Sequence, residues 1–263
     1  MDLKLKGKAA LVCGSSQGIG RAIADALAAE GADVAINSRS PDKLVLVREE
    51  IVRATGARVT AIPGDLTDPD AIDDVVDAAR AAFGKLDILV TNTGGPPSGP
   101  FEDHNAKVWR HAIAQNLESV VNLVREALPG MKQQQWGRII NVTSISVKQP
   151  VAGLILSNSI RAAVTGFAKT IANEAAPFGV TVNNILPGYT RTERLQDLAD
   201  AVAGRTGGKP GDVYESWVKE IPAGRLGTPE ELGALAAFLA SEQASYITGQ
   251  SIAVDGGWIK GLM

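Results

Sequence analysis

The chain has 263 residues, 45% of them hydrophobic, which is enough for one well-buried core, and no linker marks a second domain. Its net charge of −3 without a basic cluster argues against nucleic-acid binding, and no metal-ligand spacing is present. A single cysteine, Cys13, excludes an internal disulfide, and neither a signal peptide nor a membrane-spanning run is found. We therefore expect a cytoplasmic protein that does not contact membranes.

The first element of the chain predicts an anion-binding turn. Ala9–Cys13 is an apolar run too short for a helix, which is typical of a buried strand. Three glycines follow, and Arg21–Glu30, rich in Ala and Leu, predicts a helix that ends at Gly31. Glycines let the backbone approach a pyrophosphate, and the helix N-terminus supplies free N–H groups. The residues expected to bind it are Gly14, Ser16, Gly18, Ile19 and Gly20.

Strands and helices then alternate along the chain, which indicates right-handed βαβ units and a parallel sheet covered on both faces. We expect an α/β fold: a single Rossmann-type, doubly wound domain over residues 1–263, with ligands at the carboxyl ends of the strands. The predicted strands are Asp33–Asn37, Val59–Ile62, Leu86–Val90 and Arg138–Thr143, and the predicted helices Pro41–Thr55, Pro69–Phe83 and, approximately, Trp109–Val124.

The motifs GSSQGIG (14–20), GDLTD (64–68), LDILVTNTGG (86–95), GRIINVTS (137–144) and GVTVNNILPGYTRT (179–192) extend over most of the chain. On these motifs the chain resembles the short-chain dehydrogenase/reductase family, and within it the 3-oxoacyl-ACP reductases. The resemblance implies a nicotinamide dinucleotide cofactor and hydride transfer between it and a carbonyl or alcohol carbon of a small substrate. It assigns further cofactor contacts to Ser38, Leu66, Asn92, Gly94, Pro187, Gly188, Thr190 and Thr192.

The choice between the two nicotinamide cofactors follows from charge. A carboxylate about twenty residues past the glycines would bond a ribose hydroxyl and repel a phosphate there. Asn37 occupies that position and Arg39, which could pair with a phosphate, follows closely, so NADP is favoured over NAD. The alternative for Arg39 is a solvated loop charge. Asp65 is expected to contact the adenine, or alternatively to cap the following helix.

The catalytic residues that the resemblance implies are only half present. Asn116 and Ser144 match the asparagine and the serine of the family. Ser157 stands where the family has the proton-donating tyrosine, and Arg161 where it has lysine. A serine hydroxyl is too short and too weak an acid for the tyrosine's role. Arg161 keeps a positive charge that could bond the cofactor ribose, but arginine cannot relay a proton.

Lys148 is the substitute acid that we expect, provided that its side chain is partly desolvated beside the substrate pocket. The alternative is an exposed loop lysine. Tyr189 is predicted to contact cofactor or substrate, and His104 and His111 are predicted to be surface residues.

Two breaker-rich segments, residues 94–100 and 203–212, should border the pocket. The second lies between predicted helices Arg191–Val202 and Val213–Glu220, inside a region, about 188–222, that the resemblance identifies as a mobile substrate lid; a plain surface loop is the alternative. The resemblance also implies a homotetramer built on helices around 109–128 and 157–176. Two function classes stay open: an NADP(H)-dependent oxidoreductase with an atypical acid, and a cofactor-binding sensor or assembly partner with little redox activity.

Overall fold

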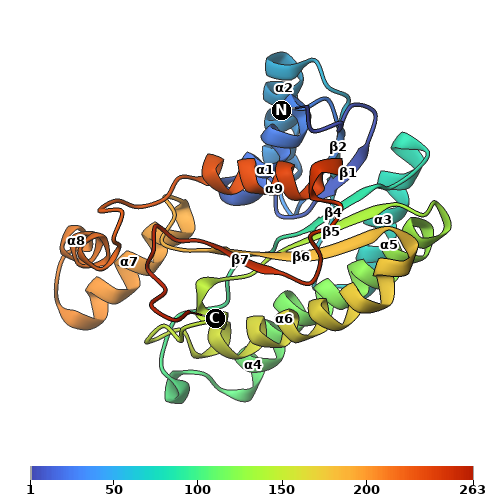
Figure 1. The fold of residues 1–263 in the computed structure, drawn as a ribbon. Helices are drawn as coiled ribbons and strands as arrows, with labels where there is room; N and C mark the ends of the chain where they lie inside the picture. The colour runs from blue at the N-terminus through green and yellow to red at the C-terminus, as the bar shows by residue number, and fades with distance from the viewer. Residues whose placement is uncertain (1, 263) are drawn as a thin grey trace.

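A seven-stranded parallel sheet forms the centre of the protein (Figure 1). The computed structural model describes residues 2–262, so Met1 and Met263 of the predicted domain lie outside the described residues. The strand order is β3-β2-β1-β4-β5-β6-β7, and the winding direction reverses between β1 and β4. The predicted α/β, Rossmann-type fold is therefore confirmed. The strands are β1 (Ala9–Val12), β2 (Asp33–Ser38), β3 (Val59–Pro63), β4 (Ile88–Thr91), β5 (Gly137–Val142), β6 (Val180–Pro187) and β7 (Ser251–Val254).

Helices cover both faces of this sheet. Helices α1, α2 and α9 lie on one face and α3 to α6 on the other, whereas α7 and α8 project beyond the sheet at one end (Figure 1). Their bounds are α1 Gly18–Ala29, α2 Pro41–Thr55, α3 Pro69–Phe83, α4 Ala106–Ile113, α5 Ser119–Gln133, α6 Ile155–Ala175, α7 Glu193–Thr206, α8 Pro210–Glu220 and α9 Pro229–Ala240. Short 3-10 turns span Phe101–Asp103, Ile145–Val147, Ala176–Phe178 and Glu242–Ala244.

Local capping explains why α2 and α3 begin and end where the sequence predicts. Each begins with proline in its first turn and ends at a glycine in the left-handed conformation, Gly56 for α2 and Gly84 for α3. The side chain of Asp68 accepts a hydrogen bond from the backbone N–H of Asp70 at the start of α3. Asp68, and not Asp65, is thus the cap of this helix.

Two predicted boundaries are wrong. The stretch 203–212 is not a ten-residue loop, because α7 continues to Thr206 and α8 begins at Pro210. Gly204 is tolerated inside α7 because the helix buries Leu195, Ala199 and Ala203. The single helix predicted over 109–124 is longer and is divided by a π-helical turn at Ala114–Glu118.

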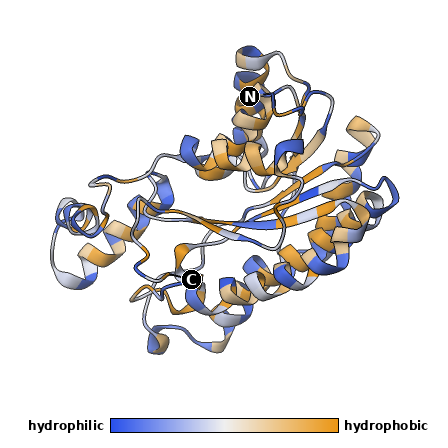
Figure 2. Ribbon diagram, in the orientation of Figure 1, coloured by the Kyte–Doolittle hydropathy of each residue, from blue (hydrophilic) through white to orange (hydrophobic). Residues whose placement is uncertain are grey.

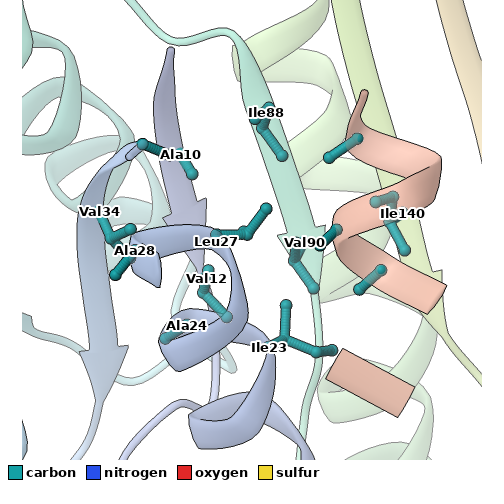
Figure 3. Close-up of a cluster of buried hydrophobic side chains, with 14 of the residues drawn as sticks. Ala10, Val12, Ile23, Ala24, Leu27, Ala28, Val34, Ile88, Val90 and Ile140 are labelled. Carbon is teal, nitrogen blue, oxygen red and sulfur yellow. The ribbon is translucent and has the colours of Figure 1, made fainter. Parts of the chain in front are cut away.

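Two clusters of buried apolar side chains lie on opposite faces of the sheet. In Figure 2, hydrophobic residues follow the strands and recur along the helices that cover them. On the α1 face, Ile23, Leu27 and their neighbours in α1 pack against β1, β2 and β4 (Figure 3). Helices α3, α5 and α6 bury a second cluster on the opposite face. None of the helices in residues 2–262 combines the length and apolarity needed to cross a membrane.

The turn between β1 and α1 is so tight that two of its glycines leave no space for a side chain. Gly14 has φ +57°, and a Cβ atom on it would lie 2.6 Å from the carbonyl oxygen of Asn92. A Cβ atom on Gly20 would lie 2.2 Å from the carbonyl oxygen of Gly14. Because both neighbours are backbone atoms, neither can move aside cheaply.

We predict that Gly20→Ala destabilises the protein by about 1–3 kcal/mol or more, since the added methyl group forces the turn and α1 apart. The matched control is Gly130→Ala in α5, where a Cβ atom meets nothing within 4 Å and alanine improves helix propensity by up to ~1 kcal/mol. Urea unfolding of both variants checks this expectation. Equal stability of the two variants would contradict it.

Candidate active site

A cleft of about 380 Å³ opens at the carboxyl ends of β1 to β4, where the winding direction of the sheet reverses. Asn92, which follows β4, donates hydrogen bonds from its side-chain amide to the carbonyl oxygens of Gly14 (3.1 Å) and Cys13 (3.3 Å). These contacts place the end of β4 directly against the glycine turn. The cleft is lined by Gly14, Ser16, Gln17, Asn37, Ser38, Arg39, Ser40, Lys43, Gly64, Asp65, Leu66, Thr67, Asn92, Thr93, Gly94 and Gln115.

One end of the cleft carries positive charge. Asn37 is buried and donates its side-chain amide to the carbonyl oxygen of Ile62 (3.0 Å), so no carboxylate occupies the end of β2. The exposed Arg39 and Lys43 line the same end, and Lys43 donates to the side-chain oxygen of Gln17 (2.8 Å). This part of the cleft therefore suits a phosphate better than a bare ribose.

Asp65 lies opposite these cations with its carboxylate fixed by Thr67, whose N–H and hydroxyl both donate to it (3.0 and 2.9 Å). Burial acts to raise the pKa of Asp65, but the hydrogen bonds from Thr67 and the nearby charge of Arg39 outweigh it and lower the pKa. Asp65 is therefore a charged acceptor at the wall of the cleft.

The N-terminus of α1 faces the cleft without a side-chain cap. Its N-cap residue, Gln17, makes no capping hydrogen bond, and the first turn contains no acidic residue. The N–H groups at such a helix start, with the positive end of the helix dipole, bind anions such as a pyrophosphate. The residues present thus fit the phosphates of a dinucleotide, a group that the structure itself does not contain.

The first turn of α7 lies against this glycine turn. The side-chain amide of Gln17 donates to Glu193, and the position of a Cβ atom on Gly18 is 3.5 Å from the methyl group of Thr192. Thr192 also caps α7, accepting from the N–H of Leu195 (3.2 Å). The start of α7 therefore contacts the residues that begin α1.

A buried cation lies behind the opposite end of the cleft. Arg161, in α6, is 9% exposed and donates to the carbonyl oxygen of Val142 (2.8 Å) and to the side-chain oxygen of Asn116 (3.2 Å). Thr93, which lines the cleft, donates its hydroxyl to the same Asn116 oxygen (3.2 Å). The π-helical turn that interrupts the helix contains Asn116, and such turns are frequent at functional sites.

No carboxylate compensates this buried charge within residues 2–262, where Arg161 bonds only to uncharged oxygens. Burial, together with the nearby charge of Arg194, lowers the pKa of Arg161 to about 10. The guanidinium therefore still carries its charge at neutral pH.

Three serines lie near the end of β5 and the start of α6. The hydroxyl oxygen of Ser144 accepts a hydrogen bond from the N–H of Ser146 (3.1 Å), which leaves the hydroxyl proton of Ser144 free to donate. The hydroxyls of Ser146 and Ser157 lie 3.4 Å apart, and either could be the donor. Ser157 and Arg161 are both buried and one helical turn apart on α6, so they share a face of that helix.

The structure corrects two expectations about single residues. Lys148 is exposed at the end of a 3-10 turn and is not partly desolvated, so the condition for its role as an acid is not met. His104 is buried, not at the surface, because it packs against Gly99, and its Nε2 atom has no hydrogen-bond partner. His111 is exposed, as predicted.

Tyr189 packs inside an aromatic cluster formed with Trp217 of α8 and Trp258 near the C-terminus. Its ring stacks on Trp217 with centroids 4.8 Å apart and meets the edge of Trp258 at 5.8 Å. Burial and the nearby Glu220 raise the pKa of Tyr189 to about 12. These contacts suit packing better than proton donation at neutral pH.

The cleft unites only part of the predicted cofactor set, namely Gly14, Ser16, Ser38, Arg39, Asp65, Leu66, Asn92 and Gly94. The lining does not include Gly18, Ile19, Gly20, Pro187, Gly188, Thr190, Thr192 or Arg161. Sequence reasoning missed Gln17, Lys43, Thr67, Thr93 and Gln115. Gln17, Thr67 and Thr93 lie inside the motifs quoted above, and Lys43 is a cation in the first turn of the helix that follows Arg39.

The cost of the unpaired cation can be measured against a second buried arginine. Arg138 is 2% exposed, bonds three carbonyl oxygens and forms an ion pair with Glu242 (3.8 Å). We predict that Arg138→Met costs about 2–4 kcal/mol of unfolding free energy, because Glu242 and the carbonyl groups lose their partner. Arg161→Met should change this free energy by less than about 1 kcal/mol, because relief of the desolvation cost of the lone charge offsets the lost hydrogen bonds to the Val142 carbonyl and Asn116. Denaturant unfolding of the ligand-free proteins measures both, and equal losses would contradict the prediction.

Comparison with known proteins agrees with this geometry. A family model described as Enoyl-(Acyl carrier protein) reductase matches residues 14–259. The chain is 40% identical to a D-beta-hydroxybutyrate dehydrogenase of Cupriavidus necator over 257 residues, covering 97% of this chain and 99% of that protein. It is 34% identical to a 3-oxoacyl-[acyl-carrier-protein] reductase of Aquifex aeolicus, with 98% and 99% covered.

A solved structure shares the whole fold. The L-sorbose reductase of Gluconobacter frateurii, crystallised with NADPH and L-sorbose, superposes with a TM-score of 0.94 at 34% identity, covering 100% of both chains. The predicted resemblance is thereby confirmed over nearly the full length. The chain belongs to the short-chain dehydrogenase/reductase family of oxidoreductases.

Proposed function

We propose that this protein is an NADP(H)-dependent oxidoreductase that acts on a small carbonyl or alcohol compound with an atypical proton donor. The observation that carries the proposal is the pair of contacts that Arg161 makes behind the cleft, with Asn116 and with the carbonyl oxygen of Val142, two residues before Ser144. The names of its relatives, a hydroxybutyrate dehydrogenase and a sorbose reductase, support a small hydroxy or oxo compound as the substrate.

The preference for NADP rests on the end of the cleft that lacks a carboxylate. Arg39, Lys43 and Ser40 would bind a ribose phosphate, whereas Asn37, whose amide nitrogen donates to Ile62, presents no carboxylate to a ribose hydroxyl. The NADPH bound by the sorbose reductase supports this assignment. We assign the remaining predicted contacts, from the glycine turn and from Pro187, Gly188, Thr190 and Thr192, to the pyrophosphate and nicotinamide parts.

Arg39→Ala should weaken NADPH binding by about 1.5–3 kcal/mol and leave NADH binding unchanged, since a charged hydrogen bond to the phosphate is lost. The control is Arg53→Ala, an exposed arginine in α2 outside the cleft lining. Fluorescence titration of both cofactors gives the four dissociation constants. A wild-type protein that binds NADH as tightly as NADPH would refute the preference.

The proposed mechanism assigns one task to each residue. When bound, the cofactor supplies the hydride that reduces the carbonyl carbon. Ser144, whose hydroxyl proton is free, donates a hydrogen bond to the carbonyl oxygen. The fixed charge of Arg161 stabilises the negative charge that develops there, while Asn116 and the carbonyl of Val142 hold the guanidinium in place. The proton then comes from solvent, because the exposed Lys148 and the short Ser157 offer no buried acid.

The turnover numbers of single variants test these separate roles of the site residues. Ser144→Ala and Arg161→Met should each reduce kcat by about a hundredfold, the scale expected when a charge-stabilising donor is removed. Lys148→Met should change kcat by less than about fivefold, whereas a general acid would cost a hundredfold or more. The measurement is NADPH oxidation with a panel of carbonyl compounds. A hundredfold loss in Lys148→Met would restore the lysine as the acid.

The second function class is a cofactor-binding protein with little redox activity. It stays open because Ser157 stands where the family has its proton-donating tyrosine. The double variant Ser157→Tyr with Arg161→Lys distinguishes the classes. If it creates carbonyl reductase activity in a protein that has none, the natural chain binds the cofactor without using it. If the wild-type protein already reduces a carbonyl compound, the oxidoreductase assignment holds.

We also propose that residues 188–222 act as a lid and that the protein is a homotetramer. The outer face of α6 exposes the small residues Ala162, Ala163 and Gly166, which permit close contact with a second copy of the helix. We expect light scattering at micromolar concentration to give a tetramer, and Ala163→Arg to dissociate it. A monomeric wild-type protein would contradict the prediction.

A further inference from the structure

Two cations face one short segment of the site from opposite ends. Thr93, at its start, bonds Asn116, which in turn bonds Arg161. At its end, Arg194 of α7 donates to the carbonyl oxygen of Pro96. Four residues span at most about 11 Å, and the charge of Arg194 acts on Arg161, so both guanidinium groups lie near the same short segment.

Arg194 lies directly on the backbone of this segment. A Cβ atom on Gly95 would lie 2.8 Å from its Nε atom and 3.2 Å from Nη2, so a larger residue there would displace the guanidinium. Arg194 is solvent-accessible, in contrast to the buried Arg161. One cation, Arg161, thus lies buried behind the cleft, and the other, Arg194, lies on the segment that follows Gly94 of the cleft lining.

The positive charges of Arg161 and Arg194 repel each other, and few negative groups nearby compensate them. Neither Arg161 nor Arg194 forms an ion pair within residues 2–262. The charge of Asp197, three residues after Arg194 in α7, acts to raise the pKa of Arg194 but is outweighed. Desolvation is the larger influence on Arg194 and lowers its pKa, and Arg194 lowers the pKa of Arg161. An anion bound between them would relieve both the repulsion and the desolvation cost.

Resting on the proposed function, we propose that the substrate is an oxo acid or hydroxy acid whose carboxylate is bound between Arg161 and Arg194. A guanidinium presents paired N–H donors that match the two oxygens of a carboxylate, so the arginines would fix its orientation as well as its charge. Ser144 would then receive the neighbouring carbonyl oxygen. In the reaction the ketone carbon would gain a hydride from the reduced cofactor, the C=O π bond would open, and its oxygen would take a proton from solvent, with the carboxylate unchanged.

The carboxylate site can be tested without turnover, by measuring binding to a complex that cannot react. The probes are pyruvate, acetoacetate and benzoylformate, each paired with its methyl ester, and they are titrated into protein saturated with NADP⁺, which cannot reduce them. Because Trp217 and Trp258 pack against Tyr189 at the base of the lid, tryptophan fluorescence reports binding. At least one acid should bind ten times or more as tightly as its ester.

Arg194→Leu should reduce that preference to less than threefold while the dissociation constant of NADP⁺ stays within twofold. The control is Arg191→Leu, an exposed arginine three residues earlier, which should keep the full preference. Arg194→Lys, which keeps the charge and loses the paired donors, should retain an intermediate preference.

Two results would overturn the inference: no acid preferred over its ester, or a loss of NADP⁺ affinity in Arg194→Leu that equals the loss for the acid. The second result would assign Arg194 to the cofactor phosphates. If acids bind more tightly than their esters but no NADPH is oxidised, the proposed oxidoreductase function is wrong and the proposed carboxylate site is supported. If acids and esters are reduced equally well, the oxidoreductase function is supported and the carboxylate site is wrong.

Discussion

The side chain of Asn92 holds the carbonyl oxygens of Cys13 and Gly14, and the geometry of the site depends on this contact between the ends of β4 and β1. These strands are neighbours in the sheet, yet the chain winds away from them in opposite directions, so a cleft opens between their carboxyl ends. Because Gly14 and Gly20 have no side chains, α1 begins close behind β1, and the floor of the cleft is backbone. The ends of β2 and β3 then bring Arg39 and Asp65 to its walls.

The buried charge of Arg161, behind the opposite end of the cleft, destabilises the folded protein. Arg138 and Arg161 are both buried, but Arg138 has an ion pair with Glu242 and lies over the ring of Trp136, whereas Arg161 has only neutral acceptors. Burial of a charge without a partner costs free energy that the rest of the core must offset. Residues that are costly to the fold are expected at functional sites, since a sequence selected for stability alone would place an apolar side chain there.

The sequence predicted best what local physical chemistry determines. The ends of α2 and α3 follow from Pro41, Pro69 and the two terminal glycines, and the β1 turn from its own glycines. Tertiary packing decided the rest. Gly204 suggested a loop, but burial of its neighbours in α7 outweighed its low propensity. The π-helical turn around Asn116, the burial of His104 and the exposure of Lys148 depend on contacts between distant segments, which no local pattern reports.

In the proposed mechanism, the buried arginine makes the chemistry differ from that of a reductase that depends on a tyrosine. A tyrosine donates a proton and is neutral before it does so, whereas Arg161 offers a permanent charge and no transferable proton at neutral pH. Such a charge lowers the energy of the site only when negative charge arrives beside it. A developing oxyanion supplies that charge for the duration of the transition state, and a substrate carboxylate supplies it on binding. With Arg194 as a second cation, the proposed site would hold negative charge more firmly than it delivers protons.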